Sequence, residues 1–181
     1  MHERRFNREI ERLRDPERVA RMEVERVINL SLESLDRVQT VLDVGTGSGL
    51  FAEAFAGRGL KVSGLDANPD MLPAAQQYVP SGTFQEGTAE KLPFPDGSFD
   101  LVFMGLLLHE TDDPLAAIKE AYRVAVQRVA VLEWPYEDQP IGPPLADRIP
   151  FERIADFARQ AGFKLGKQAR MEKLVLYSFD R

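Results

Sequence analysis

Residues 41–49 read VLDVGTGSG, and this stretch decides the fold class. Its first residues are mostly apolar and predict a short buried strand, while Gly45, Gly47 and Gly49 predict a tight turn into a helix. Glycine lets the backbone turn sharply and approach a ligand closely, and the N-terminus of the following helix presents free N–H groups. The arrangement is typical of a nucleotide-binding turn, although a tight turn without a ligand has the same appearance.

Strands and helices alternate on both sides of this turn. After the strand at 40–44 and the helix at 49–57, we expect a strand at 60–65 and a helix opening at Asn68-Pro69. Further strands are expected at 83–85, 99–104 and 128–133, with a helix from Asp113-Pro114 to about Ala125 before the last of them. Such alternation predicts a parallel sheet with helices on both faces.

The last third of the chain changes character after Trp134. A proline-rich loop spans 135–150, and a helix at 151–161 ends at Gly162. Two strand-like runs, 163–168 and 173–179, predict a closing hairpin.

The N-terminal stretch is rich in both charges and in apolar residues at helical spacing. Asp15-Pro16 is a helix start, with the aspartate as N-cap and the proline in the first turn. The apolar residues that recur after it are Val19, Met22, Val27, Leu30 and Leu35. Arginines and acidic residues nearly cancel over 3–23, which favours a solvated amphipathic helix over a nucleic-acid interface.

Composition and net charge exclude some classes of protein and of binding partner. The 181 residues are 44% hydrophobic and 29% charged, which fits a single globular domain. A net charge of −6 disfavours nucleic acid as the partner, and no apolar run approaches the roughly 20 residues that span a bilayer. The chain has no cysteine and no apolar signal core, so we expect a cytoplasmic protein with no metal site.

Two aspartates near the glycines indicate what kind of ligand the turn binds. Asp66 ends the second strand, about 20 residues beyond the glycines, where a carboxylate can accept hydrogen bonds from ribose hydroxyls. Asp43 lies inside an otherwise apolar strand just before Gly45. Its charge would repel the pyrophosphate of a dinucleotide and would favour a cationic ligand. S-adenosylmethionine carries an ammonium and a sulfonium and no phosphate.

Three segments carry a family resemblance. Residues 41–49, 64–72 (GLDANPDML) and 90–102 (EKLPFPDGSFDLV) resemble, in order and spacing, the motifs of the class I S-adenosylmethionine-dependent methyltransferases. The similarity is to the branch related to ubiquinone and menaquinone biosynthesis. It implies an α/β, doubly wound, Rossmann-like fold. We expect a seven-stranded, mainly parallel sheet with a C-terminal antiparallel hairpin and helices on both faces.

The resemblance also implies roles for particular residues. Glycine-loop residues would line the methionine part of the cofactor, Asp43 would help hold its ammonium, and Asp66 would accept both ribose hydroxyls. Ala67 and Met71 would flank the adenine, and the backbone of Met104 and Gly105 would approach the methionine. The predicted cofactor-binding set is Asp43, Gly45, Thr46, Gly47, Asp66, Ala67, Met71, Thr88, Ala89, Glu90, Met104 and Gly105.

Three positions depart from the family pattern. Thr88 stands where many relatives have an aspartate that accepts from the adenine amino group, which puts that contact in doubt. Residues 124–128 replace the usual Pro-Gly-Gly turn before the fifth strand. The Asn-Pro-Pro-Tyr motif of amino-group DNA methylases is absent after the fourth strand, which argues against methylation of nucleobase amines.

His109 is the candidate general base. It follows the fourth strand, so it should lie at the carboxyl edge of the sheet, where ligands bind. An ordinary histidine pKa near 6.5 leaves it partly neutral at cellular pH. Packing beside the cofactor is the alternative. Glu110 would orient His109 or cap the next helix.

Looser similarity to small family members covers the two ends of the chain. It rests on His2, Phe6, residues 15–18, the run 103–110 and the Gly142-Pro143-Pro144 loop with Arg148. It implies that the N-terminal segment folds over the cofactor and that the loop shapes the acceptor site. Arg148 would bind an acidic acceptor group, with a plain surface arginine as the alternative, and Trp134 would stack on an acceptor or pack under the loop.

We therefore predict one methyltransferase domain over 1–181. It would comprise a helical cap (1–37), a cofactor-binding core (38–134) and an acceptor-side loop with the C-terminal hairpin (135–181). The predicted activity is methyl transfer from S-adenosylmethionine to a small molecule. Alternatives are a cofactor-binding protein without transfer activity, a nicotinamide-dependent oxidoreductase, and an RNA or protein methyltransferase. The acceptor atom and the oligomeric state remain open.

Overall fold

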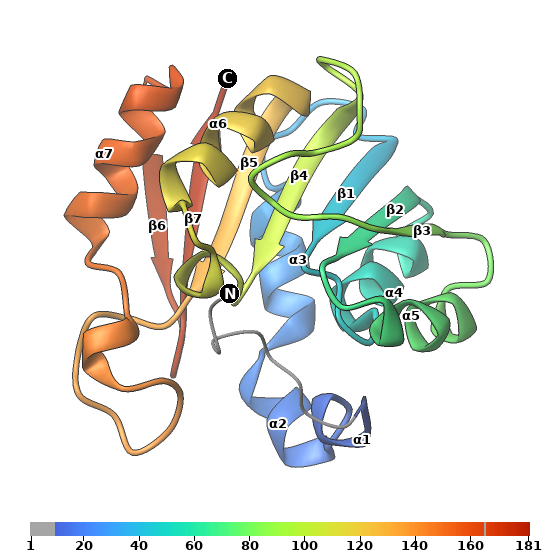
Figure 1. Ribbon diagram of the computed structural model, residues 1–181, viewed down its shortest axis with the longest axis horizontal. Coiled ribbons are helices and arrows are strands. Elements are labelled where there is room, and N and C mark those ends of the chain that lie inside the picture. The colour runs from blue at the N-terminus through green and yellow to red at the C-terminus, as the bar shows by residue number, and fades with distance from the viewer. Residues whose placement is uncertain (1–9, 165) are drawn as a thin grey trace.

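A computed structural model describes residues 10–164 and 166–181 of the chain. In these residues seven strands form one sheet in the order β3-β2-β1-β4-β5-β7-β6 (Figure 1). The first five in this order pair in parallel, and β7 runs antiparallel to both β5 and β6. The strands are β1 (Thr40–Val44), β2 (Lys61–Asp66), β3 (Thr83–Glu86), β4 (Phe99–Gly105), β5 (Ala125–Glu133), β6 (Gly166–Arg170) and β7 (Val175–Asp180). The predicted fold class is confirmed.

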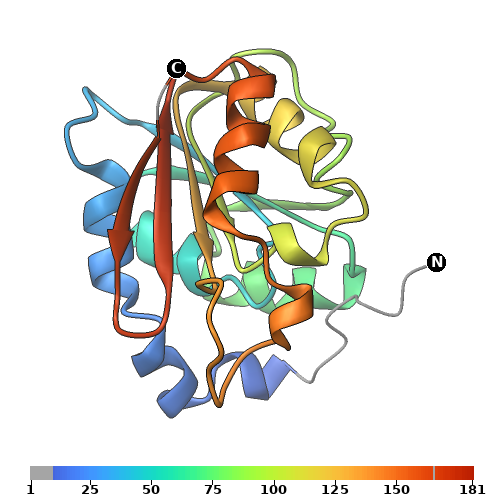
Figure 2. The same cartoon turned by 90° about the vertical axis from the view of Figure 1, so that its left-hand side faces the viewer.

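Helices cover both faces of the sheet (Figure 2). The helices are α1 (Ile10–Leu13), α2 (Pro16–Arg21), α3 (Val24–Leu32), α4 (Leu50–Gly57), α5 (Leu72–Tyr78), α6 (Pro114–Val124) and α7 (Phe151–Ala161), with short 3₁₀ turns η1 (Pro69–Met71), η2 (Leu108–Glu110) and η3 (Leu145–Asp147). Within the described residues no helix combines the length and the apolar character needed to cross a membrane.

The central strands are buried on both faces, and their residues alternate between two cores. Leu101 and Phe103 of β4 pack with α3 and α4, whereas Val102 and Met104 pack with α6 and α7. Successive side chains of a strand point to opposite faces, so one apolar strand serves both layers. This explains why β4 is almost continuously hydrophobic.

The N-terminal helix is shorter than its apolar spacing predicts. Asp15 caps α2 as expected, because its side chain accepts from the backbone N–H of Arg18 at 3.0 Å. The helix ends at Arg21, since Glu23 has a φ of 45° in the left-handed region, and α3 begins at Val24. A non-glycine residue with this conformation cannot continue a right-handed helix.

Two boundaries near the C-terminus also differ from the prediction. Helix α6 passes directly into β5 at Ala125, three residues before the expected strand start, so the chain needs no separate turn there. The hairpin is confirmed, but its first strand begins at Gly166 rather than at Phe163. Phe163 instead directly follows the helix C-cap at Gly162 and packs against the rings of Tyr122 and Phe179.

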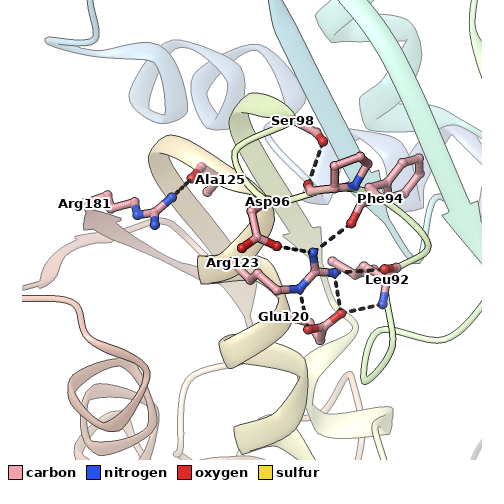
Figure 3. A network of polar contacts seen from close by, with 9 residues as sticks. Leu92, Phe94, Asp96, Ser98, Glu120, Arg123, Ala125 and Arg181 are labelled. Carbon is pink, nitrogen blue, oxygen red and sulfur yellow. Dashed lines mark hydrogen bonds and ion pairs between the residues drawn. The ribbon is translucent and has the colours of Figure 1, made fainter.

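The long connection from β3 to β4 is held by Arg123 of α6 (Figure 3). Its guanidinium donates to the carbonyls of Leu92 and Phe94 and to the carboxylates of Asp96 and Glu120, all at 2.7–3.0 Å. Hydrogen bonds to these carboxylates raise the pKa of Arg123. One side chain thus fixes a segment that has little regular structure of its own.

Candidate functional site

A cavity of about 1190 Å³ opens at the carboxyl ends of β1, β2 and β4. This is larger than the roughly 300–1,000 Å³ of an ordinary small-molecule pocket. Open α/β sheets bind ligands at this edge. Residues from segments far apart in the sequence line the cavity; they lie within 11–22, 44–51, 65–71, 87–90, 105–112 and 141–144, together with Trp134.

The loop after β1 requires its glycines. Gly45, Gly47 and Gly49 have φ values of 71°, 52° and 76°, which L side chains rarely adopt. A Cβ on Gly45 would lie 2.8 Å from Cδ1 of Leu107, and one on Gly49 would lie 2.9 Å from Cα of Ala75. The glycines therefore allow both the turn and the close packing around it.

Asp43 is buried beneath this loop. Only 1% of the residue is exposed, and its Oδ2 accepts a hydrogen bond from Oγ1 of Thr46 at 2.8 Å. Burial raises the pKa of Asp43 to about 7, with a further contribution from the charge of Asp66. Thr46 lines the cavity, whereas Asp43 does not. Asp43 is therefore placed to act through Thr46.

Asp66 ends β2 and lies at the cavity wall. Its Oδ2 accepts from the backbone N–H of Gly47 at 2.7 Å, and its Oδ1 accepts from that of Asn68 at 2.9 Å. Burial raises the pKa of this carboxyl, and the two backbone hydrogen bonds oppose the rise. Each carboxylate oxygen has a second lone pair, so Asp66 can still accept from a ligand hydroxyl.

The other predicted cofactor residues are mostly brought together. Ala67, Met71, Thr88, Ala89, Glu90 and Gly105 all line the cavity. Oε1 of Glu90 accepts from the backbone N–H of Asp112 at 2.9 Å, which links this wall to the segment after β4. Met104 is an exception, because it is fully buried and does not line the cavity.

Leu106 joins the two sides of the cavity. It follows β4 with a φ of 56°, an unusual conformation for a non-glycine residue. Its backbone N–H donates to the carbonyl of Leu132 at 2.8 Å, and its side chain lines the cavity. The reversal at Leu106 leads directly into η2, which carries His109.

His109 lies against a buried carboxylate of the neighbouring strand. Its Nδ1 is 2.7 Å from Oε2 of Glu133, and their side chains are 8% and 3% exposed. Burial by itself lowers the pKa of His109, but the charges of Glu133, Glu110 and Asp147 raise it overall. Glu110 lies at 3.7 Å from Nε2, so the orienting hydrogen bond comes from Glu133. One feature of the sequence pointed to this pairing. Glu133 ends an apolar strand, and a carboxylate that is buried there needs a partner.

Trp134 and Arg148 organise the proline-rich loop. Gly142 packs on the Trp134 ring, because a Cβ there would lie 2.8 Å from ring atoms, and Trp134 also lines the cavity. Arg148 is 5% exposed and donates to the carbonyls of Pro135, Glu137, Ile141 and Pro143. It does not line the cavity, and four of the five guanidinium N–H groups are used. The expected acceptor-binding role of Arg148 is therefore replaced by a structural one.

Two arginines of the N-terminal segment were not among the predicted site residues. The guanidinium of Arg14 lies 3.5 Å from the ring centroid of Tyr78, donates to the carbonyl of Ser48 and pairs with Glu53. Arg18 lines the cavity and donates to the carbonyl of Leu13. These partners lie far along the chain from Arg14, so residue spacing does not reveal them.

His2 and Phe6, which belong to the segment predicted to fold over the cofactor, lie outside the described residues.

In the described part of the chain, no three histidine, aspartate or glutamate side chains lie close enough together to hold a metal ion.

Comparisons with known proteins agree with this geometry. Residues 42–130 match the family model described as a methyltransferase domain. A demethylmenaquinone methyltransferase of Chlorobaculum parvum is 41% identical over 90 residues, which is 49% of this chain and 37% of that protein. A malonyl-[acyl-carrier protein] O-methyltransferase of Erwinia billingiae is 40% identical over 86 residues, 48% of this chain and 34% of that protein.

A solved structure extends the similarity over nearly the whole chain. The S-adenosylmethionine-dependent methyltransferase of Aquifex aeolicus superposes with a TM-score of 0.81 at 26% identity, covering 94% of this chain and 96% of that one. The curated relatives are longer, and the matched part spans about a third of their length. Residues 42–130 of this chain therefore match a methyltransferase domain, and the chain as a whole has the fold of an S-adenosylmethionine-dependent methyltransferase.

Proposed function

We propose that this protein transfers a methyl group from S-adenosylmethionine to a small-molecule acceptor. The observation that carries the proposal is the hydrogen bond from the Gly47 N–H to the Asp66 carboxylate, at 2.7 Å. A dinucleotide site presents the N–H groups of its glycine loop to a pyrophosphate. Here a carboxylate already occupies one of them, so the loop suits a ligand that has no phosphate.

The residues present fit S-adenosylmethionine. When bound, this cofactor supplies an electrophilic methyl group on a sulfonium. Asp66 would accept from the ribose hydroxyls, and Ala67 and Met71 would lie beside the adenine with Thr88, Ala89 and Glu90. The methionine part would lie along Gly45, Thr46, Gly47 and the backbone of Gly105. Asp43 would act on the ammonium indirectly, through Thr46.

Several observations support a small acceptor. The space beyond the glycine loop is bounded by Leu106, His109, Trp134 and the loop 141–144, and the net charge of −6 disfavours RNA. Two relatives are named for demethylmenaquinone and for malonyl-[acyl-carrier protein], which are quite different acceptors. Their names therefore do not identify the acceptor of this chain. His109 would serve as the general base. We also retain one domain over 1–181 and a cytoplasmic location as predictions.

The cofactor assignment has a direct test in thermal unfolding. S-adenosylhomocysteine should raise the melting temperature of the protein, and NAD should not, because only the former suits a loop already bonded to Asp66. A rise in the melting temperature with NAD but not with S-adenosylhomocysteine would contradict the proposal.

The transfer step has a separate test. The protein is incubated with cofactor labelled in its methyl group and with metabolite extracts, and labelled products are separated. A labelled small molecule supports the proposal. Binding of S-adenosylhomocysteine without any labelled product across many extracts would instead identify a cofactor-binding protein, and label in RNA or protein would identify a macromolecular substrate.

A further inference from the structure

Glu133 is a buried carboxylate whose two oxygens face N–H groups. Oε2 lies 2.7 Å from Nδ1 of His109 and 3.3 Å from the backbone N of Trp134, and Oε1 lies 3.3 Å from the backbone N of His109. The residue is 2% exposed and does not line the cavity. It therefore acts on the ligand space indirectly, through His109 and the backbone of Trp134, and His109 is the only one of these that can titrate.

The short contact to Nδ1 determines where the imidazole carries its proton. An ionised carboxylate only accepts hydrogen bonds, so the nitrogen facing it must be the N–H nitrogen. In the neutral imidazole the other nitrogen, Nε2, then holds the free lone pair. Because His109 lines the cavity while Nδ1 is taken by Glu133, the lone pair is the part of the ring available to a ligand.

We propose that Glu133 is a positioning residue that keeps the His109 proton on Nδ1 and presents Nε2 as a base to the acceptor. The proposal rests on the methyltransferase function proposed above and specifies its substrate class. The acceptor carries a removable proton on the attacking atom, as a hydroxyl, a phenol or an ammonium does. That proton goes to Nε2, and the electron pair of the broken bond stays on the acceptor atom. The Nδ1 proton remains shared with Glu133.

Three carboxylates from different elements act on the His109 ring. Glu133 belongs to β5, Glu110 to η2 with its Oε1 3.7 Å from Nε2, and Asp147 to η3. Together they outweigh the effect of burial, so the pKa of His109 lies above its ordinary value. A raised pKa makes the neutral imidazole a stronger base but shifts its availability to higher pH. Base action by His109 should therefore increase as the pH rises through this pKa.

Nuclear magnetic resonance tests the proton position without any acceptor. The chain has two histidines, and His109→Ala assigns their ¹⁵N ring signals. In the wild-type protein above the pKa, His109 should show the tautomer with the proton on Nδ1. A proton on Nε2 in the neutral wild-type ring overturns the proposal whether or not any variant folds.

The matched variants are Glu133→Gln and Glu152→Gln. The first removes the charge at Nδ1 but keeps an oxygen that can accept, and the second removes an exposed carboxylate of α7. The pKa of His109 should fall in Glu133→Gln, because the substitution removes the opposite charge in contact with Nδ1 that raises it. It should stay unchanged in Glu152→Gln. An unchanged pKa in Glu133→Gln contradicts the proposal.

Reactivity of Nε2 separates positioning from a merely structural role. Diethylpyrocarbonate modifies neutral imidazole nitrogens, and mass spectrometry after digestion distinguishes His109 from His2. The rate at His109 should follow its neutral fraction with pH, and the midpoint should move to lower pH in Glu133→Gln. Absence of modification at every pH would mean that Nε2 does not face the cavity, and the proposal fails.

The outcome is independent of the cofactor assignment. If S-adenosylhomocysteine fails to stabilise the wild-type protein, the proposed function falls, while the tautomer and the titration still report on Glu133. If the ligand stabilises both wild type and Glu133→Gln but the His109 pKa is the same in both, only the present inference falls.

Discussion

The two rims of the cavity are built in different ways. The cofactor rim, residues 43–49 and 66–71, depends on backbone: glycines with positive φ, and the Asp66 carboxylate bonded to main-chain N–H groups. The acceptor rim, residues 106–109, 133–134 and 141–148, depends on side chains that meet across strands, such as His109 with Glu133 and Arg148 with the loop carbonyls. A backbone-built rim has little freedom to change, whereas a side-chain rim can be altered residue by residue. The following experiments test this difference, from the largest expected effect to the smallest.

The buried charge of Asp43 should dominate the pH dependence of stability. Its pKa rises from an ordinary 3.8 to about 7 in the fold, so over this window the native state holds a proton that the unfolded state has lost. The free energy of unfolding therefore falls as the pH rises from about 4 to 7. A difference of this size corresponds to a loss on the order of 4 kcal/mol.

Asp43→Asn should remove that dependence. Denaturant unfolding of both proteins between pH 5 and 8 measures it, and the difference between them isolates Asp43, because the raised pKa of His109 acts in the same direction in both. Parallel pH profiles for the two proteins would contradict the assigned burial cost.

On the acceptor rim, Arg148→Met should cost about 3 kcal/mol of stability. The substitution removes a buried guanidinium that donates to four carbonyls. A hydrogen bond to a charged group contributes about 1.5–3 kcal/mol net of its exchange with water, and relaxation of the loop would return the freed carbonyls to water and recover part of the total. The affinity for S-adenosylhomocysteine should change less than twofold, on the order of 0.4 kcal/mol.

The control for Arg148→Met is Arg153→Met, at an exposed position on α7, with an expected cost within about 0.5 kcal/mol. Equal costs at the two positions, measured by urea unfolding, would show that the loop does not depend on Arg148.

Two glycines separate backbone strain from crowding. Gly59 has a φ of 81° with nothing within 4 Å of an added Cβ, so Gly59→Ala should cost about 1 kcal/mol from strain alone. Gly49 has a φ of 76° and would place the Cβ 2.9 Å from Cα of Ala75, so Gly49→Ala should cost about 2 kcal/mol or more. The melting temperatures of both variants check the order, and an equal drop would remove the packing argument.

Asp66→Ala should weaken the binding of S-adenosylmethionine more than tenfold, which is roughly 1.4 kcal/mol. The residue both accepts from Gly47 and lies at the cavity wall. Calorimetry measures the affinity, and Asp70→Ala, at an exposed position four residues later, serves as the control. Unchanged affinity in Asp66→Ala would refute the ribose role.

The same difference explains what the sequence could predict. Gly45 was predictable because the left-handed backbone of the turn requires glycine. Asp66 was predictable because it ends the next strand, about 20 residues beyond the glycines. The pairing of His109 with Glu133 was not, since it depends on the register between β4 and β5, where Gly105 lies opposite Leu132. Arg148 shows the same limit. A buried arginine serving backbone carbonyls and an arginine binding a ligand are identical as sequence.

Leu106 has a consequence for how the site can diversify. Its left-handed backbone favours glycine, yet the position carries a side chain that lines the cavity. Replacing it by glycine would relax the main chain and enlarge the ligand space at once. Most pocket-widening substitutions lose packing and stability together, but here the two effects on the fold oppose each other. Leu106 also packs against the core, so the strain that glycine relieves offsets part of the packing that it loses. Leu106 is therefore a position at which substrate range can drift during evolution, or be redesigned, at a lower cost than at an unstrained position of the pocket.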